Sequence, residues 1–278
     1  MDAWLPNPSG KPGIQRLYSE LAIETILTLR LVFKLPLRQV EGFVNSLFSM
    51  MALPLRSPDH TTLSRRNKTL RPTIRPALSG KGPLDIVVDS TGLSIHGEGR
   101  WRQEKHGNHK RRRWRKLHIA VDRHGLVLSC SLTNETRKDA SQVSGLLRAV
   151  RGRMRSFTAD GGYDERGVYA AVAKHSSKAS VIIPPRVNAQ KSSCSTAALK
   201  QRNEHIKAIA TKGVYRWRRE SGYYRQSIVE NTIYRYKQII GPSLRARNDH
   251  SRKVEAVLGC KILNRCRALG MPQSYKVA

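Results

Sequence analysis

Three acidic residues of the sequence, Asp89, Asp160 and Glu230, have the type and placement to bind a divalent cation. They belong to a set of only 20 acidic residues, in a chain that also carries 51 Lys and Arg. Hard cations such as Mg²⁺ prefer oxygen ligands and keep several waters, so two or three carboxylates plus substrate phosphate oxygens make a suitable site. Two such ions about 4 Å apart can activate an attacking oxygen and stabilise a leaving oxygen during phosphodiester displacement. We therefore take these acids as candidate catalytic and metal-binding residues, with Mg²⁺ as the ion and Mn²⁺ as its substitute.

Each of the three acids also has an ordinary structural explanation. Asp89 and Asp160 precede Ser, Thr and Gly residues that favour turns, and Glu230 could be a solvated helix residue paired with a nearby base. Taken singly, each acid is at least as easily structural as catalytic, whereas three in a suitable order of elements favour a shared site. Other acids that could replace or assist them are Asp164, in place of Asp160, and Asp122 and Asp139 as accessory groups.

The residues around these acids predict an α/β arrangement that would bring them together. Apolar, β-branched runs predict strands, of which the first ends at Asp89 and the fourth at Asp160. The turn-forming segment 122–125 joins the second and third strands as a hairpin, and Glu230 lies on a late helix. The stretch before that helix is expected to be irregular and basic. The predicted strands are 86–88, 117–121, 126–132, 156–159 and 181–183, and the predicted helices are 139–150, 168–174 and 227–241.

The first part of the chain predicts a helical region ahead of this α/β part. Apolar residues at helical spacing predict helices over 18–33 and 36–51. The segment 75–83 is rich in Pro and Gly and marks the expected boundary. We therefore divide the chain into a helical DNA-binding region of residues 1–80 and a catalytic domain of residues 84–270.

A short third helix of the N-terminal region is a candidate for DNA recognition. Ser57 can cap it, and Pro58 suits the first helical position. Arg65 and Arg66 follow on the next turns. This pattern is consistent with the second helix of a helix-turn-helix, which lies in the major groove, so we expect both arginines to contact DNA.

The strongly basic composition predicts a polyanionic partner. The formal net charge is +31 and the isoelectric point is about 10.9, so the compact state repels itself unless a polyanion is nearby. With 39% hydrophobic residues the chain is expected to fold, which places this charge on a folded surface and makes nucleic acid the first partner to consider. A basic stretch around Trp114 follows the strand of Asp89 and is well placed to contact backbone phosphates. Its candidate DNA-binding residues are Arg111, Arg112, Arg113, Arg115 and Lys116.

The order of elements and the residues around the acids resemble those of DDE transposases from bacterial insertion sequences, in particular the branch that groups insertion-sequence families four and five. In that branch the last acid lies in a motif of Tyr, two residues, Arg, three residues, Glu, six residues and Lys. This sequence matches the motif at Tyr223, Glu230 and Lys237, and has Gln226 where the Arg is expected, next to Arg225. The resemblance also covers both Asp contexts and the N-terminal segments, namely 88–92, 159–163, 35–42 and 58–65.

The resemblance implies a ribonuclease-H-like catalytic core, in which a mixed sheet is flanked by helices and preceded by a helical DNA-binding region. It implies an enzyme that binds double-stranded DNA at the terminal inverted repeats of its element, hydrolyses a phosphodiester with Mg²⁺ and joins the freed 3′ hydroxyl to target DNA. Pairing of two DNA ends implies a homodimer or a larger assembly. Tyr223, Arg225, Gln226 and Lys237 are then expected beside the DNA, where Gln226 lacks the bidentate grip of an Arg on phosphate.

Two other classes of protein stay open on the sequence. A non-catalytic DNA-binding protein would use the same basic surface, and a metal-dependent nuclease would lack the strand-joining step. An aspartic protease fits poorly, because the extra residue in Asp89-Ser90-Thr91-Gly92 displaces the Gly from the spacing that those enzymes use. Scattered cysteines without a CxxC pair predict a reducing cytoplasm, and no apolar stretch is long enough for a membrane span. We expect a cytoplasmic bacterial enzyme that is associated with the nucleoid.

Overall fold

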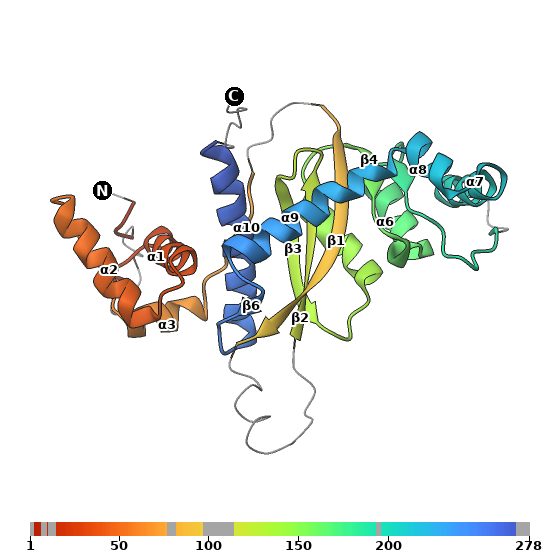
Figure 1. The fold of residues 1–278 in the computed structure, drawn as a ribbon. Coiled ribbons are helices and arrows are strands. Elements are labelled where there is room, and N and C mark those ends of the chain that lie inside the picture. The colour runs from red at the N-terminus through yellow and green to blue at the C-terminus, as the bar shows by residue number, and fades with distance from the viewer. Residues whose placement is uncertain are drawn as a thin grey trace, which may run out of the picture.

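The computed structural model of the chain describes residues 3–6, 10, 15–76, 82–96, 114–192 and 196–270. The candidate DNA-binding residues Arg111, Arg112 and Arg113 lie outside these ranges. Figure 1 shows the N-terminal helices at one end of the molecule, a sheet in the middle and a pair of helices at the other end. No helix in the described part of the chain is long and apolar enough to cross a membrane.

The N-terminal region contains the three predicted helices. The third begins later than expected, because its N-cap is Asp59, whose carboxylate accepts hydrogen bonds from the N–H groups of Thr61 and Thr62 at 2.9 Å. The predicted cap at Ser57 is therefore wrong; the Ser57 N–H donates to Oδ1 of Asn45 at 2.8 Å and fixes the preceding loop. The three helices are α1 (Glu20–Val32), α2 (Leu37–Met50) and α3 (His60–Asn67).

The sheet is mixed, as predicted, and all five expected strands are present. Its strand order is β3-β2-β1-β4-β5, in which β2 is antiparallel to both β1 and β3, β4 is parallel to β1, and β5 is parallel to β4. A short sixth strand pairs with the far end of β1. The strands are β1 (Leu84–Ile95), β2 (Trp114–Asp122), β3 (Val127–Asn134), β4 (Met154–Thr158), β5 (Ser180–Ile182) and β6 (Ser243–Leu244).

Helices cover both faces of the sheet, and each face has its own hydrophobic core. On one face, Ile86 and Val88 pack with α5 (Val143–Ala149) and α6 (Arg166–His175). On the other face, Val87 and Leu93 pack with α9 (Gln226–Ile239) and α10 (Asp249–Ala268). The alternation along β1 follows the period of two that a strand imposes, so each face of this central strand is buried by a different pair of helices.

The hairpin between β2 and β3 has the predicted turn. Gly125 takes a positive φ of 75°, a conformation that glycine adopts without strain. The Asp122 carboxylate accepts hydrogen bonds from the N–H groups of His124 and Leu126 at 2.8 and 2.9 Å. Asp122 is buried and is occupied by the turn, which removes it as an accessory ligand of a cation site.

A helical hairpin occupies the stretch that we expected to be irregular. It consists of α7 (Ala197–Lys212) and α8 (Val214–Ser221), joined at Gly213, whose φ is 79°. The expectation of an irregular segment is therefore wrong. The helices bury few side chains, Leu199 and Trp217 among them, so the sequence shows no apolar stripe of the kind that predicts a helix.

The N-terminal helices share a core with the end of the chain. Ile23 and Leu27 of α1 belong to the same buried cluster as Ile262 of α10. An ion pair joins Glu24 to Lys261 across this interface. The helical region and the sheet are therefore packed against each other through α10, as Figure 1 also shows.

Candidate functional site

Asp89 lies inside β1, which continues to Ile95, and not at the end of a strand as predicted. The strand continues because β2 pairs with it antiparallel as far as Ser94. On its other side, the pairing with β4 ends at Val87, which lies opposite Thr158. At Asp89, β1 is therefore paired on one edge only, so the chain leaving β4 can turn away there and open a site.

Asp160 lies two residues after the end of β4, and Asp89 likewise lies two residues after Val87, the last residue of β1 that pairs with β4. The exposed Asp160 side chain accepts a hydrogen bond from the Gly162 N–H at 2.9 Å. A Cβ on Gly162 would lie 3.0 Å from that carboxylate oxygen, so the glycine lets Asp160 hold this orientation.

Glu230 is carried by α9, which crosses β1 on the face of Val87 and Leu93. Val229 and Ile233 of α9 are buried against the sheet, whereas Glu230 is exposed. The period of two along β1 puts Asp89 on the same face as Val87, which is the face that α9 covers.

The charges of other candidate acids act on the carboxyl of Asp89. Burial raises the pKa of the half-buried Asp89 carboxyl to about 6, and the charges of Asp160, Glu230 and Asp139 add to this effect, against a hydrogen bond from the Ser90 N–H. Like charges at short range disfavour ionisation, so these carboxylates repel one another.

The charges of all three acids act on the hydroxyl of Tyr223. Burial raises the pKa of this hydroxyl, and the charges of Asp160, Glu230 and Asp89 raise it further, whereas Arg218 lowers it. The guanidinium of Arg218 lies 5.7 Å from the Tyr223 ring centre. The three predicted acids, which come from segments far apart in the sequence, therefore influence the same motif tyrosine.

The donor set of this place suits a hard divalent cation, although it is incomplete by itself. Within the described ranges, no three Asp, Glu, His or Cys side chains are gathered closely enough to hold a metal ion alone. Mg²⁺ is usually bound by one or two carboxylates together with waters and substrate phosphates. The residues therefore fit a metal that is held jointly by the protein and a phosphate-bearing substrate, and such a cation would relieve the repulsion around Asp89.

Comparison with known families decides the class of the protein. One family model, described as a transposase DDE domain, matches residues 80–265, which is more than half of the chain. A second model with the same description matches residues 1–98. The chain belongs to this family: it is a DDE transposase. The matched residues include the strands, the acids and α9, and the transposase has the predicted mixed sheet flanked by helices.

Two solved structures resemble the transposase only distantly. One is the Drosophila P element transposase strand transfer complex, with 11% identity, 92% of this chain and 81% of that chain covered, and a TM-score of 0.32. The other is the Mos1 mariner paired end complex with Mn, with 11% identity, 84% and 81% coverage, and a TM-score of 0.25.

The other candidate acids of the transposase have different surroundings. Asp164 is buried and its carboxylate accepts hydrogen bonds from Arg202 at 2.7 and 3.0 Å, so it is a structural residue and not a substitute for Asp160. Asp139 is half-buried, 3.1 Å from the Lys116 ammonium, and its charge acts on Asp89. Asp139 therefore lies at the edge of the site, as an accessory acid would.

Gln226 is buried inside the protein, which corrects our expectation that it lies beside the DNA. It is only 4% exposed, and its Nε2 donates to the carbonyl of Val88 at 3.3 Å. The reason is that α9 begins at Gln226, which puts this residue on the buried face with Val229. Its neighbour Arg225 is half-exposed, and its guanidinium lies 3.9 Å from the Asp85 carboxylate. Gln226 thus ties α9 to the strand residue before Asp89.

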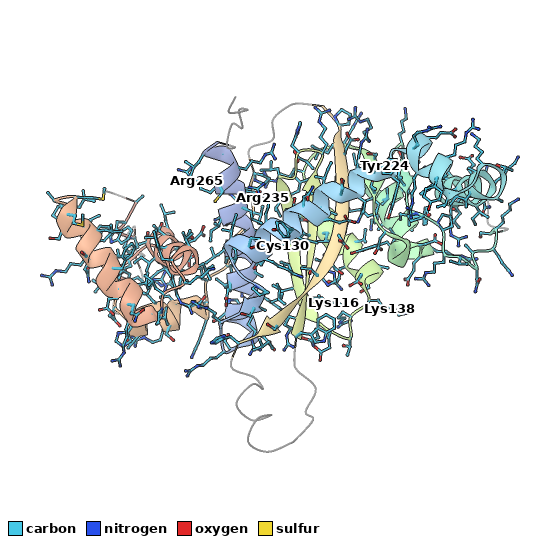
Figure 2. The ribbon with its side chains drawn as sticks, viewed as in Figure 1. Lys116, Cys130, Lys138, Tyr224, Arg235 and Arg265 are labelled. Atoms are coloured by element: carbon cyan, nitrogen blue, oxygen red, sulfur yellow. The ribbon has the colours of Figure 1, made fainter. Side chains whose placement is uncertain are left out.

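The remaining candidate DNA-binding residues differ in their exposure and in their ion pairs within the protein. Arg115 pairs with Asp249 at 2.9 Å and Glu135 at 3.5 Å, and Lys116 pairs with Asp139, so both are partly neutralised within the protein. Lys237 is half-buried on α9 and Arg65 is exposed on α3. The basic side chains are spread widely, with Arg235 and Arg265 over α9 and α10 and Lys116 and Lys138 near the start of β2 (Figure 2).

Two residues of the helical hairpin support the site and were not predicted. The Trp217 Nε1–H donates to Nδ1 of His205 at 3.0 Å, and the His205 Nε2 atom lies 2.7 Å from the Val181 carbonyl. The Trp217 ring centre is 5.6 Å from that of Tyr223, so these contacts hold Tyr223 against the acids. The only signal in the sequence was a single Trp inside a polar, basic stretch.

Proposed function

We propose that this transposase binds the terminal inverted repeats of an insertion sequence, cleaves a phosphodiester bond there with Mg²⁺, and joins the freed 3′ hydroxyl to target DNA. The observation that supports the proposal is the match of residues 80–265, which contain Asp89, Asp160 and Glu230, to the transposase DDE domain. Mn²⁺ would substitute for Mg²⁺. The net charge of +31 suits double-stranded DNA as the partner at both steps.

In this proposal the protein supplies position and charge. Asp89, Asp160 and Glu230 hold the divalent ions, which when bound activate the attacking oxygen and stabilise the leaving one. Gln226 holds α9 on β1 and thereby fixes Glu230 relative to Asp89. Water is the nucleophile of the first step and the 3′ hydroxyl that of the second, without a covalent enzyme intermediate. Lys237, two helical turns from Glu230, contacts a phosphate beside the site.

The finer assignments follow from the same proposal. We infer that the transposase belongs to the branch of insertion-sequence families four and five, because of the spacing of Tyr223, Glu230 and Lys237. Two DNA ends would be paired by a homodimer or a larger assembly. The enzyme would act in the bacterial cytoplasm, at the nucleoid.

The test replaces each acid by its amide, which keeps shape and hydrogen bonding. Asp89→Asn, Asp160→Asn and Glu230→Gln are each expected to lower Mg²⁺-dependent cleavage of an inverted-repeat duplex at least a hundredfold, because each removes a charged ligand. Duplex binding without metal is expected to stay within about twofold, because phosphate contacts come from Lys and Arg. The matched control is Glu204→Gln, an exposed acid on α7, which should cleave like the wild type.

The outcomes separate the rival functions. Wild-type cleavage by any one of the three amide variants would remove that residue from the site. Binding without any metal-dependent cleavage by the wild-type protein would leave a non-catalytic DNA-binding protein. Cleavage without transfer of the 3′ end into a supercoiled target plasmid would leave a nuclease.

A further inference from the structure

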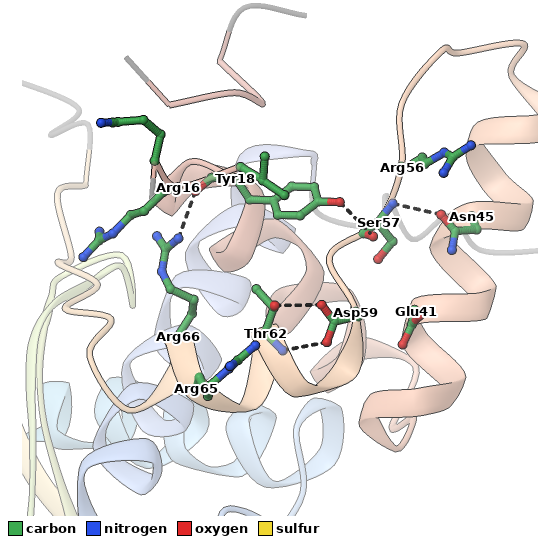
Figure 3. A pocket seen from close by; sticks show the side chains of 12 residues that line it. Arg16, Tyr18, Glu41, Asn45, Arg56, Ser57, Asp59, Thr62, Arg65 and Arg66 are labelled. Carbon is green, nitrogen blue, oxygen red and sulfur yellow. Dashed lines mark hydrogen bonds between the residues drawn. The ribbon is translucent and has the colours of Figure 1, made fainter. Parts of the chain in front are cut away.

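A wide cleft lined by several charged residues lies in the N-terminal region, away from the acids of the catalytic site. Its volume is about 950 Å³, and it is bounded by the segment before α1, by α2, and by α3 with the loop before it. Figure 3 shows side chains from all three of these parts turned toward it. The charged side chains that line it are Arg16, Arg56, Arg65, Arg66, Glu41 and Asp59.

Both carboxylates of the cleft are already engaged within the protein. Asp59 caps α3, and each of its oxygens accepts a hydroxyl hydrogen bond, from Thr61 and Thr62. These bonds hold the Asp59 pKa well below its usual range. Glu41 accepts a hydrogen bond from the His60 N–H at 2.8 Å, and the same oxygen lies 3.0 Å from the His60 ring. Because neither acid is directed at the arginines, the cleft keeps an excess of positive charge.

The arginines of the cleft are less well satisfied. Arg66 donates from Nη1 to the Tyr18 carbonyl at 2.9 Å, whereas its buried Nη2 has no hydrogen-bond acceptor among the described residues. Burial lowers the pKa of Arg66, and the charge of Arg16 lowers it further, so these two guanidinium groups are close enough to repel each other. Among the described residues, Arg16 forms an exposed ion pair with Glu20 at 3.6 Å.

The walls of the cleft are held in place before any ligand arrives. The Tyr18 hydroxyl donates to the Ser57 carbonyl at 3.2 Å, and the Ser57 N–H donates to Asn45 at 2.8 Å (Figure 3). These bonds link the segment before α1 to the loop before α3 and to α2. A site whose donors are positioned in advance loses less conformational freedom on binding.

We propose that this cleft binds a phosphodiester group of double-stranded DNA, with Arg66 Nη2 and the Arg16 guanidinium donating to its non-bridging oxygens. A phosphate oxygen supplies the acceptor that Nη2 lacks, and its negative charge removes the repulsion between the two arginines. Arg56 and Arg65 then lie beside the neighbouring phosphates of the same strand. The site contributes affinity and register, and it reads no base sequence.

This inference rests on the proposed binding of DNA, and it narrows the role of Arg66. Our expectation from the sequence placed Arg66 in a recognition helix and left open whether it contacts a base or a phosphate. The contact of Arg66 with the Tyr18 carbonyl turns its guanidinium toward the segment before α1 and into the cleft.

The experiment measures duplex binding at several salt concentrations for the full-length wild type and for Arg16→Gln, Arg66→Gln and Arg148→Gln. Arg148 is exposed on α5, on the other side of the sheet, and controls for the loss of one charge. Two duplexes are used, one with the inverted repeat and one with the same bases scrambled. Losing one phosphate contact should lower the slope of log affinity against log salt by about one and weaken binding roughly fivefold at 0.15 M salt.

The expected result is that Arg16→Gln and Arg66→Gln weaken binding to both duplexes alike, and more than Arg148→Gln does. A loss confined to the inverted-repeat duplex would overturn the proposal, because it would show base reading. A loss no larger than that of Arg148→Gln would also overturn it. Arg16→Gln keeps the test valid if Arg66→Gln unfolds, because Arg16 makes no buried contact in the described structure.

Two further measurements separate other causes. Thermal shift with inorganic phosphate should show only weak stabilisation at millimolar concentration; tight binding would assign the cleft to a small anion and overturn the proposal. Cleavage by the control variant Arg148→Gln should equal that of the wild type. If the wild type binds DNA but never cleaves it, the catalytic proposal fails while the binding result for this cleft still stands.

Discussion

Asp85 at the start of β1 is expected to stabilise the fold through a buried ion pair. Its Oδ1 accepts hydrogen bonds from Arg155 Nε at 2.9 Å and from the Ser156 hydroxyl at 2.7 Å, and Arg155 also contacts Oδ2. The Asp85 side chain is 2% exposed. The hydrogen bonds from Arg155, followed by that from Ser156 and the charges of Arg155 and Arg225, lower the Asp85 pKa to about 2 against the opposing effect of burial.

The magnitude follows from the difference between the folded and unfolded pKa. An Asp with an ordinary value of 3.8 that falls to about 2 on folding contributes about 2 kcal/mol at neutral pH. Because the folded pKa is the lower one, this stability is fully present above about pH 4 and is lost as the pH falls through about 2. Replacement by Asn removes the charge and keeps the shape.

The assay is urea unfolding, followed by tryptophan fluorescence, from pH 7 to pH 2. At pH 7, Asp85→Asn should lower the free energy of unfolding by about 2 kcal/mol, and the difference from the wild type should shrink between about pH 4 and pH 2. Glu204→Gln, in which an exposed acid is changed, should show no such convergence. A difference between Asp85→Asn and the wild type that stays constant down to pH 2 would refute the electrostatic reasoning and leave a packing defect.

Two more substitutions probe the packing of α9 and α10. Gly259→Ala would place a Cβ 2.6 Å from the Tyr236 ring and should lower the free energy of unfolding in urea by about 1 to 3 kcal/mol. The control Gly145→Ala in α5, where nothing lies within 4 Å of the added Cβ, should raise it by about 0.5 to 1 kcal/mol. Equal effects of the two substitutions would argue against a clash at Gly259. Gln226→Arg should lower the melting temperature and should not raise DNA affinity, because the site beside Val88 is buried; a stable variant that binds DNA more tightly would show that position 226 faces the DNA.

The strands could be predicted because they coincide with short apolar, β-branched runs of the sequence. The length of β1 could not, because residues beyond Val88 alternate and include Gly92, and only the pairing with β2 keeps them extended. A Cβ on Gly92 would lie 3.2 Å from the Trp114 ring, which anchors the start of β2. Such pairing is a tertiary effect that a local pattern does not contain.

The last helix, α10, was not predicted from the sequence, and the reason is also a tertiary effect. Its buried face includes Arg252 and Glu255, which are 8% and 5% exposed and break the apolar stripe. Both are satisfied by backbone groups, since Arg252 donates to the Ala246 carbonyl and Glu255 accepts from the N–H groups of Arg245 and Ala246. Charged residues with such partners can be buried, and hydrophobic periodicity then fails to show the helix.

During synthesis, α1 cannot complete its packing until α10 has been made, because the two helices share one core. About 240 residues separate Ile23 of α1 from Ile262 of α10, which share one core. At roughly 5 to 20 residues per second, the ribosome needs about 10 to 50 s to deliver that partner. Until then the apolar side of α1 lacks its final cover, so the newly made chain depends on chaperones or on fast translation to stay soluble. Slower translation should therefore reduce the yield of soluble protein without any change in its folded stability.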